Sequence, residues 1–190
     1  MKKMLLICLP LLSLVAHSQI TVVKSEGNSV VTELGYGIKV NDGSTLKRER
    51  YTINDVNCPI QLHDIGVETI YSDRSYSFKP SGKFSITEPI VAYEIHHLIY
   101  NVFGEYIKTL SNQEVKDIDN DRELRKLSSW YASENNVREY FICVSYVANV
   151  RTKTNKLWHF NYLAIKEQLQ KVKIDFEEDY IPKNEREESK

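Results

Sequence analysis

The sequence predicts a mainly β protein with a β-sandwich architecture, and three observations support this. Short apolar runs that alternate with a period of two recur along the chain, and turn-forming residues separate them. Twelve tyrosines and two tryptophans suit a pleated, half-buried surface. Hydrophobic residues make up 42% of the chain, which is enough to build a core. A closed β-barrel is the main alternative, but only seven glycines are available for its tight corners.

The first eighteen residues predict a secretory signal peptide. Two lysines precede an apolar run from Met4 to Ala16, and small residues lie just before Gln19. The run is too short to cross a membrane, which needs about 20 apolar residues. An uncleaved anchor and lipid attachment at Cys8 are the alternatives. We expect cleavage near Ser18 and Gln19, and a mature chain without a membrane span that is secreted or periplasmic.

The remaining chain divides into an N-terminal extended arm (19–56), a β-sandwich domain (57–172) and a charged tail (173–190). In the arm, apolar residues alternate from Leu34 to Val40, and a second extended run covers Leu46 to Ile53. The sequence Asn41-Asp42-Gly43 lies between these runs and predicts a β-hairpin, because glycine tolerates the positive φ of the turn. The polar residues 24–29 predict a loose loop.

The domain at 57–172 predicts a series of strands. A run from Ile60 to Tyr71 carries Gly66 as the site of a bulge, and Pro80-Ser81-Gly82 predicts a turn. The two longest predicted strands cover Ile90–Phe103 and Arg138–Arg151, and shorter ones cover Tyr106–Leu110 and Leu157–Phe160.

Two segments depart from the strand pattern. Residues 111–129 are more polar and predict a loop, and the loops at one end of the sandwich, including 111–131, would bind a partner. The apolar residues of Tyr162–Val172 change to a helical period and predict a short C-terminal helix. Seven acidic and three basic residues from Asp175 to Lys190 predict a solvated, mobile tail.

Two cysteines, Cys58 and Cys143, remain after cleavage of the leader. An oxidising compartment permits a disulfide between them, which closes a long loop and adds about 4 kcal/mol in the chain-entropy model. Two separate, half-buried thiols are the alternative, because the sequence alone does not establish that the two Cα atoms lie within bridging distance.

Catalytic and metal-binding patterns are weak in this chain. The histidines His63, His96, His97 and His159 show no zinc spacing, and neighbours in a strand point to opposite faces. There is no Gly-x-Ser-x-Gly sequence and no phosphate-binding glycine loop. Asp64, Glu88 and Glu94 are the candidates for a carboxylate pair of the glycosidase type. We expect no metal, no cofactor and no catalytic residue.

Trp130 and Tyr131 are the candidate binding residues, because they follow the polar loop and can form an exposed recognition patch. Core packing is the competing interpretation for large aromatic residues. The mature chain has a net charge of -3, since the leader contains two lysines and no acid. That charge argues against a nucleic-acid partner and leaves a protein or a glycan.

Three short motifs carry a family resemblance: Ile90-Val-Ala-Tyr-Glu94, Asn101-Val-Phe-Gly-Glu105, and Val147-Ala-Asn-Val-Arg151 followed by Trp158. Together they resemble small secreted bacterial domains with an immunoglobulin-like β-sandwich. The resemblance covers about residues 57–172 and implies that fold, with no catalytic residue.

The sequence therefore predicts an exported, non-catalytic binding or structural domain of the cell envelope or of the extracellular space. A small exported hydrolase or an enzyme accessory subunit is the alternative, and it requires carboxylates or histidines that converge in one pocket. A small-ligand carrier is the third hypothesis, and it requires a closed barrel with a deep apolar cavity.

Overall fold

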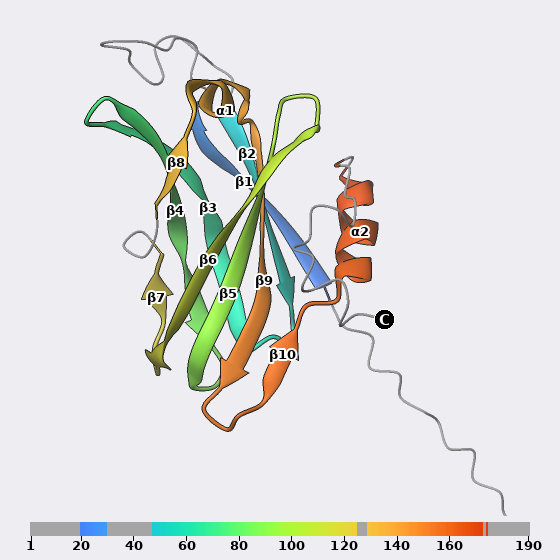
Figure 1. Ribbon diagram of the computed structural model, residues 1–190. Helices are drawn as coiled ribbons and strands as arrows, with labels where there is room; N and C mark the ends of the chain where they lie inside the picture. Colours follow the sequence, from blue (N-terminus) through green and yellow to red (C-terminus); the bar gives the residue numbers. More distant parts are fainter. Residues whose placement is uncertain (1–19, 30–46, 125–128, 173, 175–190) are drawn as a thin grey trace, which may run out of the picture.

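The computed structural model describes residues 20–29, 47–124, 129–172 and 174, which form two β-sheets and two helices (Figure 1). In chain order the elements are β1 (Ile20–Ser29), β2 (Lys47–Asp55), β3 (Ile60–Ser72), β4 (Ser75–Ile86), β5 (Ile90–Tyr100), β6 (Tyr106–Ile118), β7 (Arg122–Glu123), β8 (Trp130–Ala132), α1 (Glu134–Glu139), β9 (Ile142–Thr152), β10 (Leu157–His159) and α2 (Tyr162–Lys171). The prediction of a mainly β protein with a short C-terminal helix is confirmed.

The six-stranded sheet has the order β1-β2-β9-β5-β6, and β10 pairs with β9. The four-stranded sheet has the order β3-β4-β7, and β8 pairs with β4. All of these strand pairs are antiparallel except the parallel pair of β2 and β9. Strand β2, which belongs to the predicted arm, therefore lies inside the larger sheet.

The two sheets pack face to face, because each contributes one apolar side to a shared core. Alternate residues of β3 and β4 meet residues of β5 and β9 there, and the side chains of Phe78 and Phe84 are almost fully buried. Burial of each phenylalanine contributes about 1.5–3 kcal/mol. The members of this core from β3, β4, β5 and β9 are Ile60, Leu62, Ile65, Val67, Phe78, Phe84, Ile90, Tyr93, Ile95, Ile99, Cys143, Val147 and Val150.

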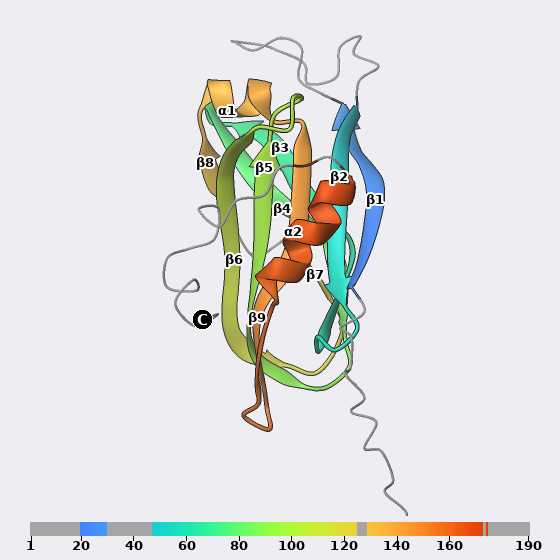
Figure 2. The same ribbon diagram turned by 90° about the vertical axis from the view of Figure 1, so that its right-hand side faces the viewer.

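Helix α2 covers part of the outer face of the six-stranded sheet, the face turned away from the other sheet (Figure 2). Asn161 caps the helix, since its side-chain oxygen accepts a hydrogen bond from the backbone N–H of Leu163. Ile165 and Leu169 are fully buried against apolar side chains of the sheet, including Tyr146. This docking gives the larger sheet a second core on its outer side.

Several local predictions are wrong. Residues 24–29 belong to strand β1, where pairing with β2 and the ion pair of Lys24 and Glu49 accommodate a polar sequence. Residues 111–118 extend β6, which is an edge strand and tolerates polar side chains. The predicted turn at residues 80–82 lies in the middle of β4, opposite a bulge in β3.

The strand predicted to begin at Arg138 begins later in the structure. Residues 134–139 form helix α1, because Ser133 accepts a hydrogen bond from the backbone N–H of Asn136 and begins a helical turn. Strand β9 starts at Ile142. The predicted leader, the Asn41-Asp42-Gly43 hairpin and, apart from Ile174, the charged tail lie outside the described residues.

Candidate functional site

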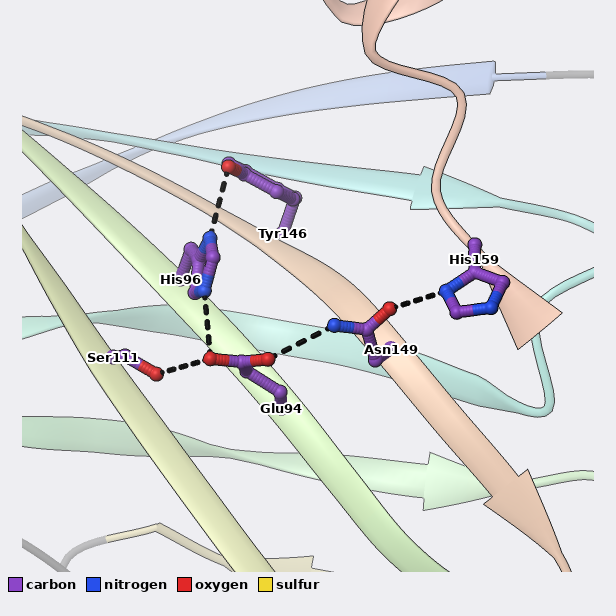
Figure 3. A network of polar contacts seen from close by, with 6 residues as sticks. All are labelled: Glu94, His96, Ser111, Tyr146, Asn149 and His159. Carbon is purple, nitrogen blue, oxygen red and sulfur yellow. Dashed lines mark hydrogen bonds and ion pairs between the residues drawn. The ribbon is translucent and has the colours of Figure 1, made fainter. Parts of the chain in front are cut away.

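Two polar clusters lie on the outer faces of the two sheets, and the first is centred on Glu94 of β5 (Figure 3). Its carboxylate accepts hydrogen bonds from His96 Nε2 at 3.0 Å and from Ser111 Oγ at 2.6 Å. The second carboxylate oxygen accepts one from Asn149 Nδ2 at 2.9 Å. Asn149 Oδ1 in turn accepts one from His159 Nδ1 at 2.6 Å. We call these residues and Tyr146 the Glu94 network.

A β-bulge in β9 assembles this network. Glu94 pairs with Asn149, whereas the next residue, Ile95, pairs with Val147, so β9 contributes one extra residue at Ala148. A bulge reverses the alternation of side chains along a strand. It therefore brings Asn149 to the same outer face as Tyr146, although three positions separate them.

The Glu94 network is closed to solvent at its histidine. His96 is fully buried, and its Nδ1 lies 3.1 Å from the Tyr146 hydroxyl (Figure 3). Hydrogen bonds, above all the one from His96, lower the pKa of Glu94 from its usual 4.5 to about 2. Because an ionised carboxylate only accepts, the His96 Nε2 carries the proton of that bond. This arrangement holds β5, β6, β9 and β10 together, and its histidine is inaccessible to a substrate.

The second cluster surrounds a pocket of about 300 Å³ on the outer face of the four-stranded sheet. His63, Lys83 and Glu123 pair across β3, β4 and β7, so their side chains share the face opposite the buried Leu62 and Phe84. The pocket is lined by Arg50, His63, Asp64, Glu68, Ser81, Gly82, Lys83 and Glu123. We call it the Arg50 pocket.

A second β-bulge shapes this pocket, as the sequence predicts for Gly66. His63 pairs with Lys83 and Gly66 with Ser81, so two residues of β3 lie opposite Gly82 alone. Asp64 adopts a φ of 49° and Gly82 a φ of 109°. A Cβ at Gly82 would lie 2.5 Å from the backbone oxygen of Asp64, so only glycine fits there.

Arg50 of β2 reaches over Gly66 into the pocket wall. A Cβ at Gly66 would lie 2.6 Å from both Cδ and Nε of Arg50, so the arginine occupies the space that a side chain would fill. Arg50 is only 7% exposed, and its Nε has no hydrogen-bond partner among the described residues. Its terminal nitrogens lie 3.8 Å from Asp64 Oδ1 and 3.9 Å from Glu68 Oε1. These are ion pairs beyond hydrogen-bond reach.

The hydrogen bonding of Arg50 differs from that of Arg48, which lies two residues earlier on β2. Arg48 donates to the backbone oxygens of Tyr140 and Val137 and to Thr69 Oγ1, at 3.0, 3.3 and 2.9 Å. Its guanidinium also lies 4.2 Å from the centre of the Tyr140 ring. Both arginines are buried, but the hydrogen-bonding capacity of Arg50 is largely unused. The buried Ser81 Oγ beside it also has no partner within the described chain.

Trp130 and Tyr131 do not form one patch. Both lie on β8, so they point to opposite faces of the four-stranded sheet. Trp130 packs into the core between the sheets, with its ring 5.8 Å from that of His97. Tyr131 is 77% exposed and pairs with Ser77 on the outer face. Of the two predicted binding residues, only Tyr131 shares a face with the Arg50 pocket.

The predicted disulfide is not formed in the structure. Cys58 and Cys143 are free, buried thiols, and they belong to different clusters of the core. Burial raises the pKa of Cys58 to about 12 and that of Cys143 to about 11. Neither thiol is therefore ionised at neutral pH, and both act as packing groups.

The candidate carboxylates and histidines are distributed between the two faces. Asp64 lines the Arg50 pocket and Glu94 lies on the other sheet, so they form no carboxylate pair. His96 contacts Tyr146, whereas His97 contacts Ser145 and Trp130, in agreement with their alternation along β5. Among the described residues, no group of three or more histidine, cysteine or acidic side chains is placed to hold a metal ion. No described helix has the length and apolarity of a membrane span.

Comparisons with protein-family models, with curated proteins and with solved structures give no match for this chain. The functional interpretation therefore depends on the geometry of the Glu94 network and of the Arg50 pocket. Sequence reasoning missed Arg50, Ser81 and Lys83 as site residues. Arg48, Arg50 and Thr52 share one face of β2, and only the structure shows that all three are buried.

Proposed function

We propose that this chain is an exported, non-catalytic binding domain that holds its ligand in the Arg50 pocket. The observation that supports this most is a nearly buried guanidinium in the wall of a pocket, whose Nε has no hydrogen-bond partner in the described part of the chain. An unsatisfied buried polar group costs free energy, about 1–3 kcal/mol and more when it is charged. A ligand in the pocket does not reach this buried Nε, but one that accepts hydrogen bonds from the terminal nitrogens stabilises the same guanidinium charge.

Export follows from the pattern of the first eighteen residues, and a secreted or periplasmic location is part of the proposal. We also propose that the two facing sheets serve as an immunoglobulin-like scaffold, with the resemblance limited to the layered arrangement. In immunoglobulin domains the sheets have strands ABED and CFG. Here the described sheets have six and four strands, and the larger one contains a parallel pair, β2 and β9.

A hydrolase is the second candidate, and one contact favours it. His63, which lines the pocket, has its Nε2 2.8 Å from Ser85 Oγ, as a base and a nucleophile require. Nucleophilic catalysis also needs a group that orients the base and donors that stabilise the oxyanion. The carrier reading has less support, since it expects a closed barrel with an apolar cavity, and this pocket is lined by charged side chains.

Ligand screening by NMR tests the proposal. The ¹⁵N-labelled mature chain is titrated separately with neutral sugars, amino acids, simple carboxylates and phosphate esters. We expect one class to shift the amide signals of Gly66 and Gly82 saturably, and Arg50→Met to abolish the effect. Arg138→Met is the matched control, because Arg138 is an exposed residue of α1.

Two results would contradict a binding function. One is that no class of compound perturbs Gly66 or Gly82. The other is turnover of an ester, peptide or glycan substrate that Ser85→Ala abolishes, which would favour the hydrolase.

A further inference from the structure

We infer that the Arg50 pocket binds a neutral, hydroxyl-rich ligand, and that this ligand is an oligosaccharide whose chain continues along the four-stranded sheet to Tyr131. The inference rests on the proposed function and names the ligand class of the same site.

The charges of the pocket favour a neutral ligand. Arg50 and Lys83 supply positive charge, and three carboxylates, Asp64, Glu68 and Glu123, supply negative charge. An anion would meet more carboxylates than cations, and a cation would meet the buried guanidinium. A hydroxyl group both donates and accepts hydrogen bonds, so it can pair with an arginine and a carboxylate at the same time.

The spacing of the charged groups favours a hydroxyl oxygen between them. The Arg50 terminal nitrogens lie 3.8 Å from Asp64 Oδ1 and 3.9 Å from Glu68 Oε1, which is too long for direct hydrogen bonds. Polar contacts at such distances are commonly bridged by a water molecule, and a ligand hydroxyl can take the place of that water and bond to both partners. Neighbouring hydroxyls of one sugar ring can bridge both pairs, and the pocket, at about 300 Å³, has the volume of a small-ligand site.

The pocket is also preformed. The Asp64 side chain accepts a hydrogen bond from Ser25 Oγ of β1 at 2.6 Å, and the bulge fixes its backbone in the left-handed region. The Arg50 side chain is confined between Gly27 and Gly66, because a Cβ at either glycine would approach its Nε within 3.0 Å. A preformed site loses little conformational entropy on binding, which suits a ligand that is itself strongly hydrated.

The register of the sheet connects the pocket to Tyr131. Gly66 pairs with Ser81, Glu68 with Lys79, and Ile70 with Ser77, which also pairs with Tyr131. Because paired and alternate residues share a face, these side chains form one stripe.

Ser81 and Ser77 are four positions apart on β4, which is about 13 Å along a strand. An oligosaccharide can span that distance, whereas a monosaccharide fills the pocket alone. The exposed ring of Tyr131 offers an apolar face on which the C–H face of a sugar can pack.

Calorimetric and NMR titrations of the mature chain test this inference. The probes are neutral hexasaccharides of glucose, mannose, xylose and N-acetylglucosamine, the matching monosaccharides, and acetate, inorganic phosphate and polygalacturonate. We expect one hexasaccharide to bind and to shift the amides of Gly66 and Gly82. Tyr131→Ala should weaken the hexasaccharide about tenfold and leave the monosaccharide unchanged. Phe103→Ala is the matched control, since this 84% exposed aromatic lies outside the four-stranded sheet.

Each of the other outcomes would overturn one defined part of the inference or of the proposed function. If acetate, phosphate or polygalacturonate shifts Gly66 and Gly82 and no neutral sugar does, the ligand class is wrong and the binding function stands. If no probe shifts these amides, both proposals fail. If a hexasaccharide binds equally well to Tyr131→Ala, the path along the sheet is wrong. Because Tyr131 is largely exposed, its replacement should not unfold the chain, and circular dichroism checks this.

Discussion

The Glu94 network and the Arg50 pocket are built in the same way but use their hydrogen bonds differently. Each lies on the outer face of a sheet, and in each a β-bulge positions a polar side chain, Asn149 in the first and Asp64 in the second. Glu94 accepts three hydrogen bonds from its neighbours. Arg50 reaches its two carboxylates only at 3.8 and 3.9 Å, and its Nε has no partner among the residues that the structure describes. The Glu94 carboxylate is therefore satisfied by hydrogen bonds within the chain, whereas the Arg50 guanidinium is not satisfied by the described residues.

This difference separates a stabilising cluster from a binding site. A satisfied polar network rigidifies the structure and resists change. An unsatisfied one weakens the free protein and gains from a ligand, so natural proteins retain it mainly where function requires it. Burial alone does not make the distinction, because His96 and Arg50 are both almost inaccessible.

The largest expected effect is on the Glu94 network. Glu94→Ala leaves the donors of His96, Ser111 and Asn149 without their acceptor, and we expect a loss of about 3 kcal/mol in the free energy of unfolding. Urea denaturation measures this. Glu134→Ala, which removes an exposed ion pair with Arg138, should cost less than about 0.5 kcal/mol. An equal loss of unfolding free energy in the two variants would show that the Glu94 network stabilises the fold no more than an exposed ion pair does.

The same network should respond to acid. The pKa of Glu94 falls from 4.5 to about 2 on folding, so the unfolded chain binds the proton more readily between these values. The stability that Glu94 contributes is therefore complete above about pH 4.5 and is lost progressively as the pH falls towards 2. Urea midpoints of the wild type and Glu94→Gln should differ most above pH 4.5 and converge below it. A constant difference across this range would contradict the assignment.

Parts of both regions could be predicted from the sequence. The alternation of β5 separates His96 from His97, and Gly66 indicates the bulge that shapes the pocket. The role of Arg50 could not be predicted from the sequence, because a charged run such as Lys47-Arg48-Glu49-Arg50 is typical of a solvated edge strand. Arg50 is buried only because β3 packs against β2. The turn at Pro80-Ser81-Gly82 was predicted wrongly for a related reason. The positive φ of Gly82 serves the bulge across the strand pair rather than a local reversal of the chain.

A third, smaller effect concerns the backbone of the pocket. Gly82→Ala places a Cβ 2.5 Å from the Asp64 oxygen at a φ of 109°, so we expect a loss of about 2 kcal/mol and a distorted bulge. The neighbouring Ser81→Ala is the control, because it removes a buried hydroxyl without a partner and should leave stability unchanged or slightly higher. Thermal and urea unfolding compare the two. A Gly82→Ala variant as stable as the wild type would show that the bulge is not the strained element.

The smallest expected change in stability is that of Arg50→Met, and it distinguishes best between a binding and a structural role for this arginine. Arg50→Met keeps most of the side-chain volume and removes a buried charge that makes no short hydrogen bond. We therefore expect stability that is unchanged or higher by up to about 1 kcal/mol, together with loss of ligand binding. Arg48→Met, two residues away, removes three hydrogen bonds and the contact with the Tyr140 ring, and should cost about 2–3 kcal/mol. If Arg50→Met is destabilised as much as Arg48→Met, Arg50 is a structural residue like its neighbour. A stable Arg50→Met variant that no longer binds would show that this arginine is retained for its ligand.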